Sequence, residues 1–175
     1  MDKIKKRRVP VSVLILSAMI LAVLMLFGNF FLGLFISVAL VTVATIVEFN
    51  KRLLFGNNFP ISVELMSVSV MFATAKFGLN WGLFVALAGI TVLVIVRRYF
   101  CAGTMVRTCS LLILALLSSV FSPLKWYVYL LIVHNAMQWI AYVGLLGNNF
   151  VTASISRASN IVLNVLVFRI MINWI

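Results

Sequence analysis

The sequence predicts an all-α fold, a polytopic transmembrane helix bundle of six to seven spans, and three observations support this prediction. Of the 175 residues, 65% are hydrophobic and 10% are charged, whereas a soluble domain carries about 25% charged residues. The apolar residues form long runs that are separated by Gly, Asn, Pro or charge. Basic residues outnumber acidic residues by 14 to 3 and gather between the runs, as in the cytoplasmic loops of membrane proteins.

Seven apolar runs could form spans, because a helix needs about 20 mostly apolar residues to cross the hydrocarbon core. We expect them near residues 10–27, 31–49, 61–75, 82–96, 106–121, 126–146 and 158–175. The first run follows a basic segment, as in a signal peptide, but its length and the lack of a clear A-x-A site favour a retained span. The third to fifth runs are short, so one of them could be tilted or re-entrant.

The breaks between the runs share a pattern in which an apolar residue is followed by Gly, Asn and an aromatic residue. It occurs at 27–30, 55–59, 77–81 and 146–150. Gly and Asn accept positive φ, and aromatic side chains favour the membrane interface, so the pattern predicts helix ends with turns. An inverted repeat would also produce matching breaks and is the alternative.

The distribution of basic residues predicts the orientation. We take residues 1–9 as a basic cytoplasmic N-terminus and residues 10–175 as a single transmembrane helical domain. Eleven basic residues then fall on the inner side, and two, Lys76 and Lys125, fall on the outer side. The loops at 51–52 and 97–107 belong to the inner set. We therefore expect a multi-pass protein of the cell membrane with a cytoplasmic N-terminus, and a re-entrant segment would move the C-terminus inside.

Composition and motifs narrow the function classes. The net charge of +11 is explained by cytoplasmic loops and does not indicate binding of nucleic acid. The chain has one histidine and no metalloprotease, serine-hydrolase or phosphate-loop motif, so no catalytic site, metal site or cofactor is predicted. Cys101 and Cys109 lie at a predicted cytoplasmic boundary and are interpreted as reduced structural thiols.

Glu64 has two interpretations. It follows Pro60 in the third run, where an acid near a helix N-terminus is stabilised by the helix dipole without any function. Alternatively, it is an intramembrane carboxylate that faces a cavity and pairs with a cation or a basic residue. The helix-start interpretation is the one we favour. Glu48, with Lys51 and Arg52 at i+3 and i+4, is expected to form an ion pair at the end of the second run.

The last two runs carry the most suggestive polar residues. At about 1.5 Å per residue from the outer boundary, His134 and Arg169 lie at similar depth, and Gln138 and Asn164 lie deeper at matched levels. We expect these two spans to be adjacent and these pairs to be neighbours. The groups could be hydrogen-bonding glue between helices. Alternatively, together with Glu64, they line a pocket for a small polar or anionic ligand in the outer half, where Arg169 has no acid at its level.

Three stretches resemble two related families of membrane proteins. They are residues 59–64 (FPISVE), 77–86 (FGLNWGLFVA) and 157–168 (RASNIVLNVLVF), the last with two Asn four residues apart. The pattern resembles the substrate-binding S components of energy-coupling factor transporters and the rod-shape-determining membrane protein D group. The resemblance covers about residues 55–168 and implies a six-helix bundle with a ligand cavity that opens outward. The first span is additional to it, and no clear Ala-x-x-x-Ala surface for a coupling subunit is visible.

Two hypotheses about function follow. In the first, the protein is an integral membrane subunit that binds or transports a solute. It lacks its own ATPase and needs other membrane subunits, such as a coupling subunit with ATPases. In the second, it is a non-catalytic structural or assembly subunit of a larger membrane complex. A membrane enzyme acting on lipid is the third and weakest, because acids and histidine are scarce. The lipid bilayer is the partner that all three share.

Overall fold

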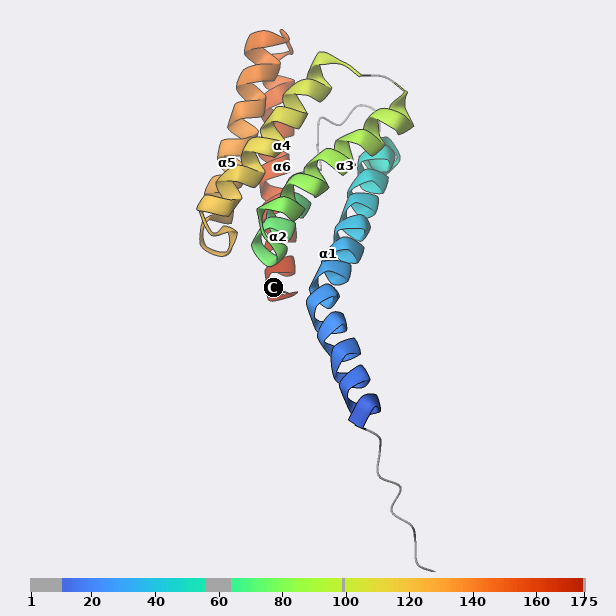
Figure 1. The fold of residues 1–175 in the computed structure, drawn as a ribbon. Helices are drawn as coiled ribbons and strands as arrows, with labels where there is room; N and C mark the ends of the chain where they lie inside the picture. Colours follow the sequence, from blue (N-terminus) through green and yellow to red (C-terminus); the bar gives the residue numbers. More distant parts are fainter. Residues whose placement is uncertain (1–10, 56–63, 99, 175) are drawn as a thin grey trace, which may run out of the picture.

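The computed structural model describes residues 11–55, 64–98 and 100–174, and these residues fold almost entirely into helices (Figure 1). The elements are α1 (Val11–Phe55), α2 (Leu65–Phe77), α3 (Leu79–Arg97), α4 (Ala102–Val120), α5 (Pro123–Ile140), the π-helical turn η1 (Ala141–Leu145), α6 (Phe150–Met171) and the 3-10 turn η2 (Ile172–Trp174). The predicted all-α fold class is confirmed.

Five helical segments are long and apolar enough to cross a membrane. They are Gly28–Asn50 of α1, Leu79–Val96 of α3, Ala102–Val120 of α4, Pro123–Leu145 of α5 with η1, and Phe150–Met171 of α6. The sixth apolar helix, α2, has only 13 residues. The described chain therefore has the helices of a membrane protein, with five candidate spans and one shorter helix in place of the seven separate runs.

The first two predicted spans are one continuous helix. No turn forms at 28–30, because α1 continues through these residues for a total of 45 residues. A glycine inside a helix costs only about 1 kcal/mol relative to Ala, so Gly28 does not end a helix that apolar residues extend on both sides. At about 1.5 Å per residue α1 measures about 67 Å, more than twice the hydrocarbon core of about 30 Å. Its first turns project well beyond the other helices (Figure 1).

The continuous helix α1 gives a membrane topology that differs from the one predicted from the sequence. The segments at 11 and at 51–55 lie at opposite ends of α1. If α1 crosses the bilayer once, the N-terminus and the loop at 51–52 cannot share one side, as the predicted hairpin required. Residues 1–10 lie outside the described residues, so their predicted side stays a prediction.

The short helix α2 forms the centre of the bundle. Nine consecutive residues from Met66 to Thr74 are buried, and α2 contacts α1, α3, α4, α5 and α6. A helix that is apolar on every side is typical of such a position. Since the other helices surround it, α2 does not need the length of a span. Glu64, the residue that precedes α2, is likewise buried in the bundle.

Glycine permits the closest packing in this core. At Gly78, with a φ of 95°, the chain reverses from α2 into α3, and few residues other than glycine adopt this backbone conformation. Four residues later, Gly82 lies against α2. A Cβ atom at Gly82 would overlap Thr74 Oγ1 and lie 3.4 Å from the Val70 carbonyl oxygen. The missing side chain therefore sets how closely α2 and α3 approach.

We predict that Gly82→Ala lowers stability, because the added methyl group forces α3 away from the buried α2. Such overpacking typically costs about 1–3 kcal/mol. Thermal unfolding of the purified protein in detergent measures the effect. Gly28→Ala is the matched control, since no heavy atom lies within 4 Å of the Cβ position there. Equal melting temperatures for the two variants would contradict the packing argument.

Candidate functional site

The candidate site is built around the carboxylate of Glu64. This residue precedes α2 at its N-cap position, and only 3% of it is exposed. One oxygen lies 2.6 Å from Nε of Arg107 on α4, and the other lies 3.3 Å from Nη1 of Arg157 on α6. Two guanidinium groups from different helices thus hold one buried carboxylate, and both favour its ionised form.

A second carboxylate extends the arrangement to α1. Arg107 Nη1 lies 3.3 Å from Glu48 Oε1, and Arg107 Nη2 donates to Glu48 Oε2 at 3.4 Å. This two-point contact is the geometry that a planar guanidinium prefers with a carboxylate. The charges alternate in the order Glu48, Arg107, Glu64 and Arg157, and the formal charges of this ion-pair chain sum to zero. Each residue comes from a different helix or helix start.

Polar side chains of α5 support the ion pairs. Gln138 accepts a hydrogen bond from Arg157 Nη1 through Oε1, and its Nε2 group donates to Ser110 Oγ at 2.9 Å. The same amide nitrogen lies 3.1 Å from His134 Nε2, while His134 Nδ1 lies 3.2 Å from the Ser110 carbonyl oxygen. Since the amide donates and the carbonyl accepts, the proton of a neutral imidazole is on Nδ1. The network therefore fixes the tautomer of His134.

Asparagines of α6 satisfy the backbone at the start of α2. The Glu64 N–H group donates to Asn160 Oδ1 at 2.7 Å, and Asn164 Nδ2 donates to the Glu64 carbonyl oxygen at 3.1 Å and to Ser67 Oγ at 2.9 Å. Asn160 in turn donates to Asn135 Oδ1 at 2.8 Å. The first N–H groups of a helix have no partner within it, so a neighbouring helix supplies one here. This bonding allows α2 to begin in the interior.

An aromatic ring packs against Arg157. Its guanidinium lies 5.0 Å from the ring centre of Tyr142, which belongs to η1, and the Tyr142 hydroxyl donates to the Gly103 carbonyl oxygen at 2.9 Å. Trp139 Nε1 donates to Ser154 Oγ at 3.1 Å on the adjacent turns of α5 and α6. A cation over an aromatic face gains further attraction, which holds the Arg157 side chain in place.

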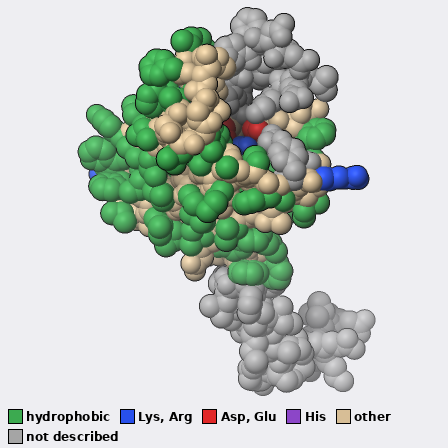
Figure 2. All heavy atoms as spheres, turned by 90° about the horizontal axis from the view of Figure 1, so that it is seen from above, with side chains coloured by type: hydrophobic (Ala, Val, Ile, Leu, Met, Phe, Trp, Pro, Cys, Tyr) green, Lys and Arg blue, Asp and Glu red, His purple; other side chains and the backbone are tan. Residues whose placement is uncertain are grey.

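The site lies near the end of the bundle where α1 ends and α2 begins. Arg107 is about 7 Å from the start of α4, and Arg157 is about 10 Å from the start of α6, at about 1.5 Å per residue. Seen from this end, acidic and basic atoms lie at the base of a hollow (Figure 2). The arginine side chains are 12% and 17% exposed, against 5% for Glu48 and 4% for Glu64. The arginine side chains are therefore more accessible than the carboxylates that they contact.

The structure brings together four of the five predicted site residues. Glu64, His134, Gln138 and Asn164 belong to one buried network, whereas Arg169 is exposed in the last turn of α6. The helix-start interpretation placed Glu64 correctly in the chain but wrongly near water, because α2 begins inside the bundle. No sequence pattern in the single chain reports that depth.

The predicted adjacency of the last two spans is confirmed, but the predicted pairs are wrong. The bonds from Asn160 to Asn135 and from Arg157 to Gln138 set the antiparallel register of α5 and α6. In this register Arg169 lies level with residue 126, about 12 Å along α5 from His134. Gln138 faces Arg157 instead of Asn164. The predicted pairs relied on span limits that lay several residues away from the observed helix ends. Because α5 and α6 run antiparallel, the errors in the two helices add up in the register between them.

Sequence reasoning missed the arginines of the site. Arg107 and Arg157 were assigned to the inner side as orientation signals, and Glu48 was paired with residues 51 and 52, whose side chains lie outside the described residues. The structure pairs Glu48 with Arg107 across 59 residues of sequence. The sequence offers one signal for Arg157, which lies three residues before Asn160 and so shares its helix face. The cluster also lies at the end that the topology assigned to the cytoplasm, opposite the predicted outer-half pocket.

Comparisons with known proteins add no relative. No protein-family model matches the chain, and no curated protein or solved structure is significantly similar to it. Among the described residues, no group of three His, Cys, Asp or Glu side chains could hold a metal ion. The fold and the site therefore define an all-helical membrane protein with a buried chain of ion pairs.

We predict that Glu64→Gln destabilises the protein strongly, because it leaves Arg107 and Arg157 without the carboxylate between them. Removing one partner of a buried ion pair typically costs about 3–5 kcal/mol. Thermal unfolding and the yield of monodisperse protein measure the loss. Arg169→Gln, which changes an exposed charge, should stay within about 0.5 kcal/mol of the wild type. A Glu64→Gln melting temperature equal to that of Arg169→Gln would show that the ion pairs contribute little.

Proposed function

We propose that the protein is an integral membrane subunit that binds and transports a solute, and that it captures a small polar or anionic solute at Arg107 and Arg157. The observation that carries this proposal is the partial exposure of both arginine side chains, whose carboxylate partners are more deeply buried. The site lies at the opposite end of the bundle from the predicted outer-half pocket, and its basic residues are Arg107 and Arg157 instead of Arg169. It keeps the predicted ligand class.

The energetics of buried charge favour a function over a structural role. Moving four charged groups out of water costs several kcal/mol per ion, and apolar residues of similar volume would often stabilise a core equally well. Ionisable residues inside membrane-spanning segments usually mark a path or binding site for a substrate. The alternating chain of Glu48, Arg107, Glu64 and Arg157 is such a set. A contribution to the stability of the fold is therefore a poor explanation for the presence of these four charged residues.

Arg157 has hydrogen-bonding capacity left for a ligand. A guanidinium carries five N–H donors. Within the described part of the chain, the hydrogen bonds and the ion pair of Arg157 all start from Nη1, toward Glu64 and Gln138. The edge formed by Nε and Nη2 is the one that binds a carboxylate or phosphate through two parallel bonds. An anionic group can therefore bind Arg157 without displacing Glu64.

The proposed subunit has no motor of its own. The sequence carries no phosphate-binding loop, so any energy from ATP must come from another subunit. We propose partners among membrane proteins, including a coupling subunit with ATPases, and no partner among nucleic acids. The proposal includes no enzymatic activity.

We predict that protein purified gently from its native membrane retains a small compound with a carboxylate or phosphate group. Arg157→Gln should lose this compound, because the ligand's two-point contact disappears, whereas Arg169→Gln should retain it. Mass spectrometry of the small molecules released on denaturation measures both. Equal retention by the two variants, or an empty wild-type protein, would overturn the proposal.

A structural or assembly subunit is the second candidate, and one observation favours it. Only 11% of the span of α6 is buried within the bundle, and its exposed face is apolar at Val151, Ile155, Val162, Leu166 and Ile170. Lipid or another membrane helix must cover this face. Co-purification separates the two candidates: an ATPase partner favours the first, and a large assembly without an ATPase favours the second.

We predict that the end of the bundle carrying the site faces the cytoplasm, because Arg98, Arg107 and Arg157 lie toward it. Cys101, an exposed thiol at the start of α4, reports this side. In a Cys109→Ser background it should react with a membrane-impermeant maleimide only after the cells are permeabilised. Lys125→Cys on the opposite end is the control and should react in intact cells. Rapid labelling of Cys101 in intact cells would reverse the orientation.

A further inference from the structure

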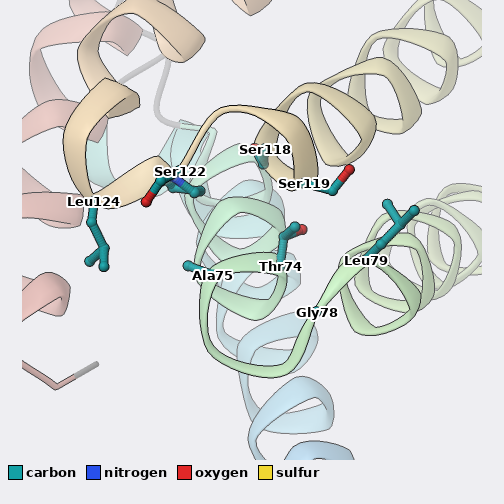
Figure 3. Close-up of a pocket in the computed structure, with 9 residues that line it drawn as sticks. Thr74, Ala75, Gly78, Leu79, Ser118, Ser119, Ser122 and Leu124 are labelled. Atoms are coloured by element: carbon teal, nitrogen blue, oxygen red, sulfur yellow. The ribbon is translucent and has the colours of Figure 1, made fainter.

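A second polar cavity lies at the opposite end of α2 from Glu64. It has a volume of about 260 Å³ and is bounded by the end of α2, the end of α4 and the start of α5. Four hydroxyl groups line it, from Thr74 on α2, Ser118 and Ser119 on α4, and Ser122 in the turn before α5 (Figure 3). Nothing in the ion-pair chain involves these residues.

Two of the lining hydroxyl groups use their protons within their own helices. Thr74 Oγ1 donates its proton to the Val70 carbonyl oxygen at 2.8 Å, and Ser119 Oγ donates to the Leu116 carbonyl oxygen at 2.7 Å. A hydroxyl whose proton is used within its own helix acts as an acceptor toward other groups. Ser118 is only 3% exposed, and its Oγ has no hydrogen-bond partner among the described residues. Its oxygen therefore has bonding capacity left for a group bound in the cavity.

Two helices also end at this cavity. The Gly78 N–H group bonds the Thr74 carbonyl oxygen at 3.0 Å, and the Phe121 N–H group bonds the Leu117 carbonyl oxygen at 2.8 Å. The carbonyl groups that follow in each last turn have no partner within their helix, and they form the negative end of the helix dipole. Both α2 and α4 therefore contribute negative potential, from turns whose residues line the cavity.

The N-terminus of α5 adds little positive potential that would oppose the negative potential of α2 and α4. Pro123 has no N–H group. The N–H groups of Lys125 and Trp126 both donate to the Ser122 carbonyl oxygen at 3.1 Å, so they are not available to an anion. Lys125 and Lys76 have exposed side chains that do not line the cavity. No basic side chain and no carboxylate is among the lining residues.

We propose that this cavity is a binding site for Na⁺, held by the hydroxyl oxygens of Thr74, Ser118 and Ser122 and by carbonyl oxygens of the last turns of α2 and α4. Hydroxyl and carbonyl oxygens at helix C-terminal ends suit a small monovalent cation inside a membrane protein. Divalent cations are usually bound with carboxylates, which the cavity lacks. The site is independent of the solute proposed for Arg157, because the two lie at opposite ends of α2.

The test is the effect of Na⁺ on thermal stability of the full-length purified protein, measured against choline at equal ionic strength. A ligand that binds only the folded state raises the melting temperature as its concentration rises. We expect a saturable rise with Na⁺ for the wild type and its loss in Ser118→Ala. Ser37→Ala is the matched control, because Ser37 Oγ on α1 is also buried without a hydrogen-bond partner among the described residues but does not line the cavity. It should keep the full response.

A second variant and a direct binding measurement keep the test decisive if the Ser118→Ala variant misfolds. Ser122→Ala removes a lining hydroxyl that makes no capping hydrogen bond to α5, so it should fold and weaken the Na⁺ response. Binding of radioactive ²²Na⁺ to the wild type should be displaced by unlabelled Na⁺. A wild type that shows neither stabilisation nor ²²Na⁺ binding would mean that the cavity holds water only. An unchanged response in both Ser118→Ala and Ser122→Ala would place any Na⁺ site elsewhere.

Discussion

The fold depends on the burial of one carboxylate at the start of α2. Glu64 is held by Arg107 from α4 and Arg157 from α6, and its backbone N–H group is bonded by Asn160 of α6. Without these contacts, a helix start and a charge would lie unsatisfied inside an apolar bundle, which is among the most costly arrangements in a membrane protein. With them, a helix of 13 residues becomes the core around which the longer helices pack.

The two ends of α2 have opposite electrostatic character. At its start, guanidinium groups and amides surround a carboxylate, and the exposed part of the site is basic. At its end, hydroxyl oxygens and carbonyl groups surround a cavity without any basic side chain. An anion and a cation would thus be bound about 20 Å apart, at about 1.5 Å per residue of the same helix. Near this second end, Gly82 lets α2 and α3 approach closely.

The sequence predicts the class of this protein but not its architecture. Apolar runs report helices, because hydrocarbon tolerates little else, and Glu64, His134, Gln138 and Asn164 were recognisable as polar residues within such runs. The continuity of α1 was missed because Gly28 and Asn29 are tolerated both in turns and in helices. The arginines were missed because a basic residue near a span end is read first as an orientation signal. Partners far apart in the chain, such as Glu48 and Arg107, leave no local pattern in one sequence.

The alternating chain of ion pairs also constrains the order in which the protein can be made. Glu64 leaves the ribosome long before Arg157, which follows 93 residues later. Until α4 and α6 have arrived, the start of α2 carries a charge and open backbone groups with no partner in hydrocarbon. The start of α2 therefore cannot complete its contacts before α6, the last of the long helices, has been made. The order of synthesis thus delays the contacts of an early residue until late in the making of the chain.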